Sequence, residues 1–238
     1  PGGANPTPVL LTAEDLRLPK AKRKYDAVEL TFERPFDGHW SLQGSYVWAK
    51  SKGNYEGAVK SDVGQTDTSL TQDFDAYFLT DGAYGYLPND RRHTFKLFGI
   101  YQVTEALRVG ANFYAQSGRP YGCLGYHPDD PSPGGQPSAW YCPIDGESVQ
   151  VPRGSRGRTG WVTNTDLNLT YDIIQDRDGF GSVSAAVDVF NLFNERSATR
   201  VVEQGETINI VGRPVTSYGR SRSFQAPRSV RFTLRYSF

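Results

Sequence analysis

Seven stretches of this 238-residue chain alternate apolar and polar side chains, and they are joined in turn by short turns and long loops. A two-residue period puts one set of side chains on each face of a β-strand, so each stretch is expected to form a strand with one apolar face. Each is close to the ~9–11 residues with which a tilted strand crosses a bilayer. The expected strands are 25–35, 40–50, 93–102, 107–118, 162–171, 182–190 and 229–238.

The lengths of the connections favour a membrane protein over a soluble one. The turns after the first, third and fifth strands are short, whereas the loops after the others cover residues 52–91, 119–160 and 192–227. Such long loops count against a compact soluble domain, but outer-membrane barrels alternate short periplasmic turns with long extracellular loops. We therefore expect an all-β, antiparallel up-and-down transmembrane β-barrel, of which this chain is a part, with its C-terminus on the periplasmic side.

Composition agrees with this fold class and excludes one kind of partner. Mean hydropathy is only −0.54 although aromatic residues make up 13% of the chain, as expected for barrel strands that alternate in polarity. The formal net charge is zero, so no nucleic acid is expected as a partner. The chain has no Met and no signal-peptide pattern at its start, so we expect a piece of a longer protein.

The last strand shows the two faces most clearly. Its apolar set, from Val230 to Phe238, is expected to face lipid, with an aromatic residue in the interfacial girdle. Taken alone, this strand also fits the edge of a soluble β-sandwich. The polar sets of the strands are expected to line a watery lumen. The expected lumen-facing residues include Glu29, Asp166, Asp188, Arg231 and Arg235.

Several motifs resemble one family. The ending RFTLRYSF resembles the C-terminal strand by which outer-membrane barrels are recognised by their assembly machinery. The run DVFNLFNE at 188–195 resembles the penultimate-strand signature of TonB-dependent receptors. The runs KGNYEG at 52–57 and LPNDRRHTFKLFGIYQ at 87–102 are similar to the Oar-like subgroup, which carries a carboxypeptidase-regulatory domain. The resemblance covers most of residues 21–238.

This resemblance implies a barrel of about 22 strands plugged by an N-terminal domain. Residues 21–238 would then be its last seven strands, residues 1–20 a segment of an extracellular loop, and the plug with its TonB box would lie elsewhere in the protein. The implied function is an outer-membrane receptor and transporter of a Gram-negative bacterium, which takes up or exports an extracellular substrate. The implied partners are the lipid bilayer, the plug and remaining strands, TonB and the barrel assembly machinery. The implied assembly signal is Phe232, Leu234, Tyr236 and Phe238.

Cys123 and Cys142, the only cysteines, lie in the second long loop. If this loop is outside the cell, the compartment permits a disulfide, which would contribute about 3 kcal/mol of stability by closing a loop of this size. A metal site formed with His127 is the alternative, but it lacks a recognisable ligand spacing. We therefore expect a disulfide and no bound metal.

Substrate contacts are expected from the long loops, where aromatic rings and arginine side chains gather. Aromatic rings stack on sugars or peptides, and guanidinium groups bind carboxylates and phosphates. For the arginines, pairing with acidic residues of the inner wall such as Glu33 is the favoured interpretation, and ligand binding is the alternative. The acidic first loop, with Asp62, Asp67 and Asp73, lacks EF-hand spacing, and a solvated loop is the favoured interpretation for it. The candidate contacts are Phe74, Tyr77, Phe78, Tyr84, Tyr126, Trp140, Arg153, Arg156, Arg220 and Arg222.

Catalysis has little support in the sequence. No Ser/His/Asp arrangement, phosphate-binding glycine motif or HExxH is present, so no catalytic residue and no cofactor are expected. His93, beside Asp90 at the expected rim, is the nearest approach to the rim sites of outer-membrane phospholipases and proteases. Two other classes remain open: a free-standing structural barrel or adhesin, and a secreted β-sandwich binding module.

Overall fold

The computed structural model describes residues 10–65, 67–68, 71–130, 135, 137–175, 179 and 181–238, and these are almost entirely β-structure. Its one short helix in these residues, α1, is Tyr77–Thr80. No helix in the described part of the chain is long and apolar enough to span a membrane.

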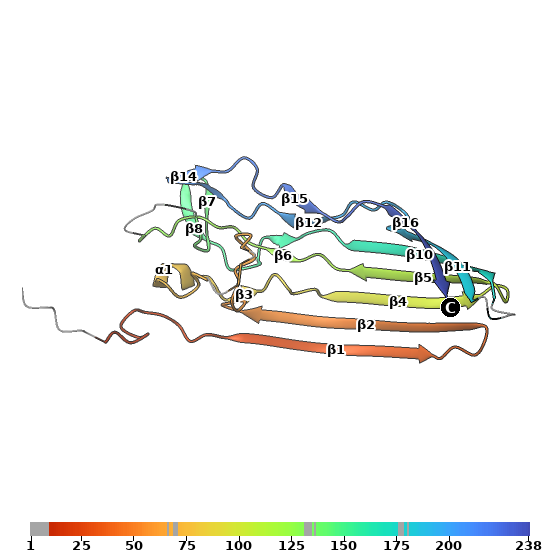
Figure 1. Cartoon of the computed structure of the whole chain (residues 1–238). Coiled ribbons are helices and arrows are strands. Elements are labelled where there is room, and N and C mark those ends of the chain that lie inside the picture. Colours follow the sequence, from red (N-terminus) through yellow and green to blue (C-terminus); the bar gives the residue numbers. More distant parts are fainter. Residues whose placement is uncertain are drawn as a thin grey trace, which may run out of the picture.

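The expected strands are present and form one antiparallel sheet (Figure 1). Successive long strands are neighbours in the sheet, and the loop strand β3 pairs with the end of β2. This up-and-down order confirms the predicted all-β barrel topology, although the sheet is open: β1 and β16 are its edges. The long strands are β1 (Arg23–Arg34), β2 (Trp40–Gly53), β4 (His93–Gln102), β5 (Leu107–Gln116), β10 (Val162–Ile174), β11 (Ser182–Phe190) and β16 (Ser229–Ser237).

The long loops contain further short strands. We call residues 54–92 the first loop, 117–161 the second loop and 191–228 the third loop. Figure 1 shows all three gathered at one end of the sheet, whereas the short turns and the C-terminus lie at the other end. The short strands are β3 (Gly85–Tyr86), β6 (Pro120–Tyr121), β7 (Tyr141–Ile144), β8 (Glu147–Gln150), β9 (Gly157–Arg158), β12 (Ala198–Val201), β13 (Glu206–Thr207), β14 (Ile210–Pro214) and β15 (Ser221–Phe224).

The register aligns the apolar sets of all the long strands on one face. Residues directly opposite each other in a ladder share a face, and most residues of these apolar sets lie opposite another apolar residue or a glycine. The side chains of Phe232 and Leu234 are 78% and 74% exposed, so no described part of the chain covers them. One such row runs through Leu42, Gly99, Ala111, Leu167, Val189 and Val230.

The opposite face carries the polar set and is linked by hydrogen bonds and ion pairs between strands. The Nε of Arg231 lies 2.9 Å from the Oδ2 of Asp188, and Asn168 donates to the Oδ1 of the same carboxylate at 2.7 Å. This is the wall pairing that the sequence suggested for arginine. Glu29, Asp166 and Arg235 also belong to this face by register. That the face lines a lumen stays a prediction.

The NLFN run has a structural role at the start of the third loop. Asn191 has a φ of 51° and Asn194 a φ of 54°, the left-handed region that Asn tolerates better than most residues. The buried Asn191 side chain donates to the carbonyls of Glu195 and Ala226, both at 2.9 Å, and accepts from the N–H of Glu195. Asn191 therefore turns the chain out of β11 and joins the two ends of the third loop.

Candidate functional site

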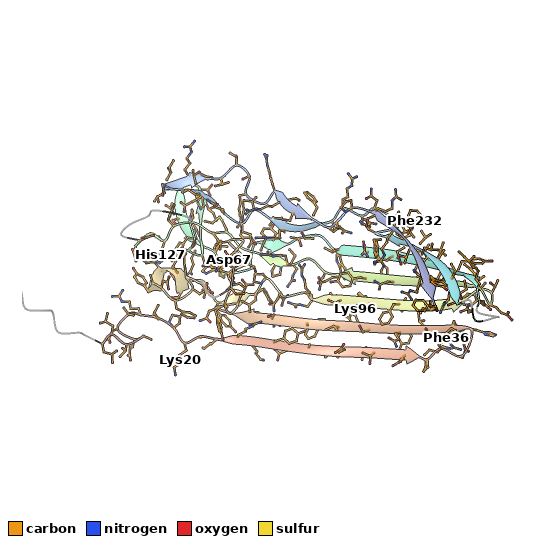
Figure 2. All side chains as sticks on the ribbon, in the orientation of Figure 1. Lys20, Phe36, Asp67, Lys96, His127 and Phe232 are labelled. Carbon is orange, nitrogen blue, oxygen red and sulfur yellow. A yellow bond between two sulfur atoms is a disulfide. The ribbon has the colours of Figure 1, made fainter. Side chains whose placement is uncertain are left out.

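The long loops pack together around a small core of their own. Trp140 of the second loop is 0% exposed, and it packs with Leu124 and with Ala83 of the first loop. The long strands contribute little to this core, because their apolar side chains point out of the sheet. Figure 2 shows side chains crowded between the loops, with Asp67 and His127 at this end and Phe36 at the turn end. The three loops therefore form a folded unit, which we call the loop unit, at one end of the sheet.

A disulfide joins Cys123 to Cys142 within the second loop. It packs against Val151 and, from the third loop, against Tyr218. Gly205 of the third loop lies so close that an added Cβ would be 2.3 Å from the Cys123 Sγ. The absent side chain at position 205 therefore lets the third loop pack against the disulfide.

Two buried cations of this unit flank the Trp140 ring. The Arg153 guanidinium pairs with Asp62 and lies 3.2 Å from the Glu56 carboxylate, both in the first loop. Its Cζ is 5.1 Å from the Trp140 ring centre, and the Lys60 Nζ is 5.5 Å from it. Lys60 is paired with Asp73 at 3.4 Å and donates to the Ser138 carbonyl at 3.1 Å. These contacts tie the first loop to the second.

A second ionic group ties in the third loop. The Arg119 guanidinium pairs with Glu203, whose other oxygen accepts the Gly122 N–H at 2.9 Å. Asp62 lies 4.0 Å from the same guanidinium. In addition, Arg200 donates to the Ser61 carbonyl at 3.1 Å. Charged groups from all three loops therefore meet in one buried network.

Burial controls the protonation of this network. Desolvation raises the pKa of Glu203 to about 7 despite the opposing effect of Arg119, because a buried carboxylate is costly to ionise. Desolvation also raises the pKa of Glu56, helped by the nearby Asp62. It lowers the pKa of Lys60, against the effect of Asp73. The free energy needed to keep these buried groups ionised in the packed loops therefore depends on pH.

A cavity of about 870 Å³ lies between the first and second loops. Its size is within the range of small-molecule sites. Apolar atoms come from Val63, Phe78 and Leu79, while carboxylates of Asp67 and Asp75 are exposed at its wall. The second loop contributes Tyr126 and Ala139. The cavity therefore combines apolar surface with negative charge.

A hydrogen-bonded cluster supports the cavity wall beside Phe78. The Asp81 carboxylate accepts the Tyr141 hydroxyl and the Gln150 amide, each at 2.5 Å. His127 lies 3.3 Å from the same carboxylate and packs edge-on against Tyr141. Burial, and next the hydrogen bond to Asp81, raises the pKa of Tyr141 to about 12. Tyr141 therefore stays a hydrogen-bond donor, and the cluster is structural.

The candidate contact residues separate into three groups. Phe78 and Tyr126 line the cavity, and Tyr77 packs on Phe78 and His127 behind it. Trp140 and Arg153 are instead 0% and 1% exposed: they hold the loops together and offer a ligand no surface. Arg153 also pairs with loop acids rather than with the wall acids suggested from the sequence. The remaining candidates, away from the cavity lining, are Phe74, Tyr84, Arg156, Arg220 and Arg222.

The sequence analysis missed the residues that join the loops, namely Lys60, Arg119, Glu203 and Glu206. Glu206 is 0% exposed, and its carboxylate accepts the N–H groups of Tyr126 and Gly212. A single Glu or Arg in a polar loop gives no periodic signal. Asp62 and Asp73 of the acidic loop are likewise paired with cations. Within the described residues, no three His, Cys, Asp or Glu side chains are grouped to hold a metal ion.

Comparison with known proteins supports the family resemblance. Residues 4–120, nearly half of the chain, match the model of the outer membrane beta barrel domain. The chain is also 31% identical over 258 residues to the TonB-dependent transporter Oar of Myxococcus xanthus, and this alignment covers 92% of the chain. The resemblance to TonB-dependent receptors of the Oar-like subgroup is thereby confirmed. The chain spans 23% of the length of that relative.

Among solved structures, the barrel segment is similar to the ferric-catecholate import receptor Fiu from K12 E. coli. The match has a TM-score of 0.46 and 16% sequence identity, and it covers 90% of this chain and 21% of that receptor. The names of both similar proteins describe a transporter and a receptor, and neither describes an enzyme.

Proposed function

We propose that the chain forms the last seven strands of a TonB-dependent outer-membrane transporter, with residues 1–20 as part of an extracellular loop. The observation that carries this proposal is the continuous apolar face, which crosses every long strand in register and is bounded on β2 by an aromatic residue at each end, Trp40 and Trp48. Arg34, at the turn end of this face, lies over the Trp40 ring. Trp40 and Trp48 are about 26 Å apart along the strand, comparable with the ~25 Å apolar band of outer-membrane barrels.

The two free edges support a larger barrel. Unpaired strand edges are not tolerated in lipid, and β1 and β16 each have one partner strand among the described residues. Further strands of the same polypeptide close the wall, and an N-terminal plug that contacts TonB fills it. The loop end faces the outside of the cell, and the short turns and the C-terminus face the periplasm.

The cavity between the first and second loops is the proposed place where substrate first binds. Its exposed Asp67 and Asp75 favour a cationic or hydrogen-bond-donating ligand, and Phe78 and Leu79 favour one with apolar parts. A peptide-like cargo combines these properties; the direction of its transport is left open. Asp75→Asn is then expected to weaken binding of a cationic peptide substrate, since it removes one of the cavity's charges.

Membrane orientation is tested by labelling single cysteines in intact cells. Cys123 and Cys142 are joined, so a new thiol reports alone. Ser155→Cys in the second loop is expected to react with a membrane-impermeant maleimide, whereas Glu105→Cys in the turn after β4 reacts only after the outer membrane is opened. Both positions are exposed. The opposite labelling pattern would reverse the proposed orientation.

The size of the native polypeptide tests the proposed organisation. An antibody against residues 119–160 is expected to detect, in detergent extracts of outer membranes, a band several times larger than the 26.4 kDa of this chain. Such a band would lead to the plug and the TonB box. A band near 26.4 kDa would instead favour a small free-standing barrel and contradict the receptor.

A further inference from the structure

The apolar face changes to positive charge at the loop end of β1 and β2. On β2 this face carries Trp48 and then, toward the loops, Lys50 and Lys52. Lys24 on β1 lies on the same face, directly opposite Lys52 in the ladder. With Arg92 and Arg158 these side chains form what we call the basic rim. At ~3.3 Å per residue, Lys50 and Lys52 lie about 7 and 13 Å beyond the aromatic Trp48.

The basic rim gathers around one aromatic ring. Tyr86 of β3 lies opposite Lys52, whose Nζ is 4.4 Å from the ring centre. The guanidinium carbons of Arg92 and Arg158 are 5.3 and 5.6 Å from it. The hydrogen bond from Arg92 lowers the pKa of the Tyr86 hydroxyl, and the charges of Lys52 and Lys50 lower it further. Positive charge therefore converges on this position.

The rim has fewer carboxylates than cations. Asp26 lies 3.1 Å from the Lys24 Nζ and opposite Lys50, and the fully buried Asp90 is shared by Arg92 and Arg158. The Lys24–Lys52 pair has like charges directly opposite each other, which destabilises a sheet. A bound anion would remove this repulsion.

An apolar groove lies on the same face below the rim. It has a volume of about 350 Å³ and is lined by Leu30, Phe32, Tyr46, Phe95 and Leu97, with Gly44 between them. Gly44 contributes no side chain, and the Phe32 ring leans over it. A groove of this kind on a lipid-facing wall fits an acyl chain.

We propose that the basic rim binds the phosphate groups of a glycolipid headgroup whose acyl chains lie along the groove between Phe32 and Phe95. Lysine and arginine bind phosphate, and cations next to a membrane surface attract anionic headgroups. The aromatic Trp48 lies between the two parts, at the interfacial level where such rings are found. A soluble anion would use the cations alone and leave the groove unexplained. The outer-leaflet placement rests on the proposed function, while the binding site itself rests on the sheet.

Native mass spectrometry of the full-length receptor, purified in mild detergent, tests this site. The probe is diphosphorylated lipid A. The test variant is Lys24→Gln combined with Lys50→Gln and Lys52→Gln. The control is Arg235→Gln, an exposed basic residue of β16 on the other face of the same sheet. Each lysine is expected to contribute roughly a factor of five to the affinity, so the triple variant should bind lipid A on the order of a hundredfold more weakly. The Arg235→Gln variant should bind like the parent.

Further arms separate a lipid from a free phosphate. Dephosphorylated lipid A is expected not to bind, because it lacks the phosphate groups. The phosphorylated sugar without acyl chains is also expected not to bind. Excess inorganic phosphate should not displace the intact lipid. Equal binding of lipid A by the parent and the triple variant would overturn the proposal, as would equal binding of its dephosphorylated form. The folding of the triple variant is checked by gel electrophoresis: a folded variant shows the same heat-modifiable mobility as the parent. Lipid binding in detergent depends neither on transport nor on membrane orientation. The labelling experiment can therefore contradict the proposed orientation while lipid A binding is confirmed, and lipid A binding can be contradicted while the orientation is confirmed.

Discussion

The adjacent residues Leu167 and Asn168 of β10 lie on opposite faces of the sheet. Leu167 lies between Ala111 and Val189 on the apolar face, whereas Asn168 donates to Asp188 on the polar face. Leu167→Arg is expected to lower the free energy of unfolding by about 2–4 kcal/mol if the residue faces the bilayer midplane. Asn168→Arg should cost about 1 kcal/mol, the value of one hydrogen bond. Urea titration of the receptor in lipid bilayers measures both, and equal costs would contradict the assignment of faces.

Asn191 combines a positive φ with three side-chain hydrogen bonds to the backbone. Asn191→Ala is expected to cost about 3 kcal/mol in unfolding free energy, because alanine strains the left-handed conformation and leaves buried backbone groups unpaired. Asn191→Gly should recover about 1 kcal/mol by removing the strain alone. The same titration measures the two variants. If glycine recovered the whole loss, the hydrogen bonds would contribute nothing.

At the scale of elements, the packing of the loops should depend on pH through Glu203. Its pKa is about 7 in the packed loops against an ordinary 4.5, so the packed state binds the proton more tightly. The contribution of Glu203 to the stability of the packed state is therefore fully present below pH about 4.5 and is lost as pH rises from there through about 7. Glu56, whose pKa is also raised, acts in the same direction.

Amide hydrogen exchange at residues 119–126 measures this dependence, after correction for the intrinsic exchange rate. Protection is expected to decrease from pH 5 to pH 8, and Glu203→Gln should flatten the decrease. An unchanged slope in that variant would assign the dependence to another group.

The backbones of the first and second loops also come into close contact at Gly85, where there is no room for a side chain. A Cβ on Gly85 would be 1.9 Å from the Arg153 carbonyl oxygen, which accepts the Tyr86 N–H at 3.1 Å. Gly85→Ala is expected to separate the loops and to make trypsin cleave after Arg153 about tenfold faster, because local opening controls access to a buried site. Gly110→Ala, where the nearest atom is at 3.5 Å, is the control and should leave cleavage unchanged.

The loop unit and the strands differ in how far a sequence predicts them. Every second residue of a strand such as β10 faces the same environment. The alternation of apolar and polar residues, as at Leu167 and Asn168, can therefore be recognised in the sequence without knowing which strands pair with β10. Burial of Arg153 depends on Asp62, which lies 91 positions away, and nothing beside either residue marks the pair. The same residue types fit a solvated loop equally well, so the sequence alone indicates ligand contacts for Trp140 and Arg153 and not burial.

At the scale of the whole molecule, the sheet is not self-sufficient. Its edges, β1 and β16, expose backbone groups that a bilayer cannot satisfy, and no described part of the chain covers the exposed Phe232 and Leu234 of its apolar face. Residues 1–238 expressed alone are therefore expected to form oligomers or aggregates in detergent, whereas the proposed full-length protein is expected to give a monomer with heat-modifiable mobility. Size-exclusion chromatography with light scattering distinguishes these states. A stable 26.4 kDa monomer would contradict this account.

Asp62, Arg119 and Glu203 come from three separate loops and meet in one ionic network, which limits how the loops of this protein can diverge among homologues. Loops usually vary independently, since each connects its own pair of strands. Here a charge reversal in one loop leaves an unpaired buried charge in another, which is strongly destabilising. Substitutions of these three residues are therefore expected to occur as matched sets, and a hybrid that exchanges one loop between homologues is expected to need its partner loops from the same donor.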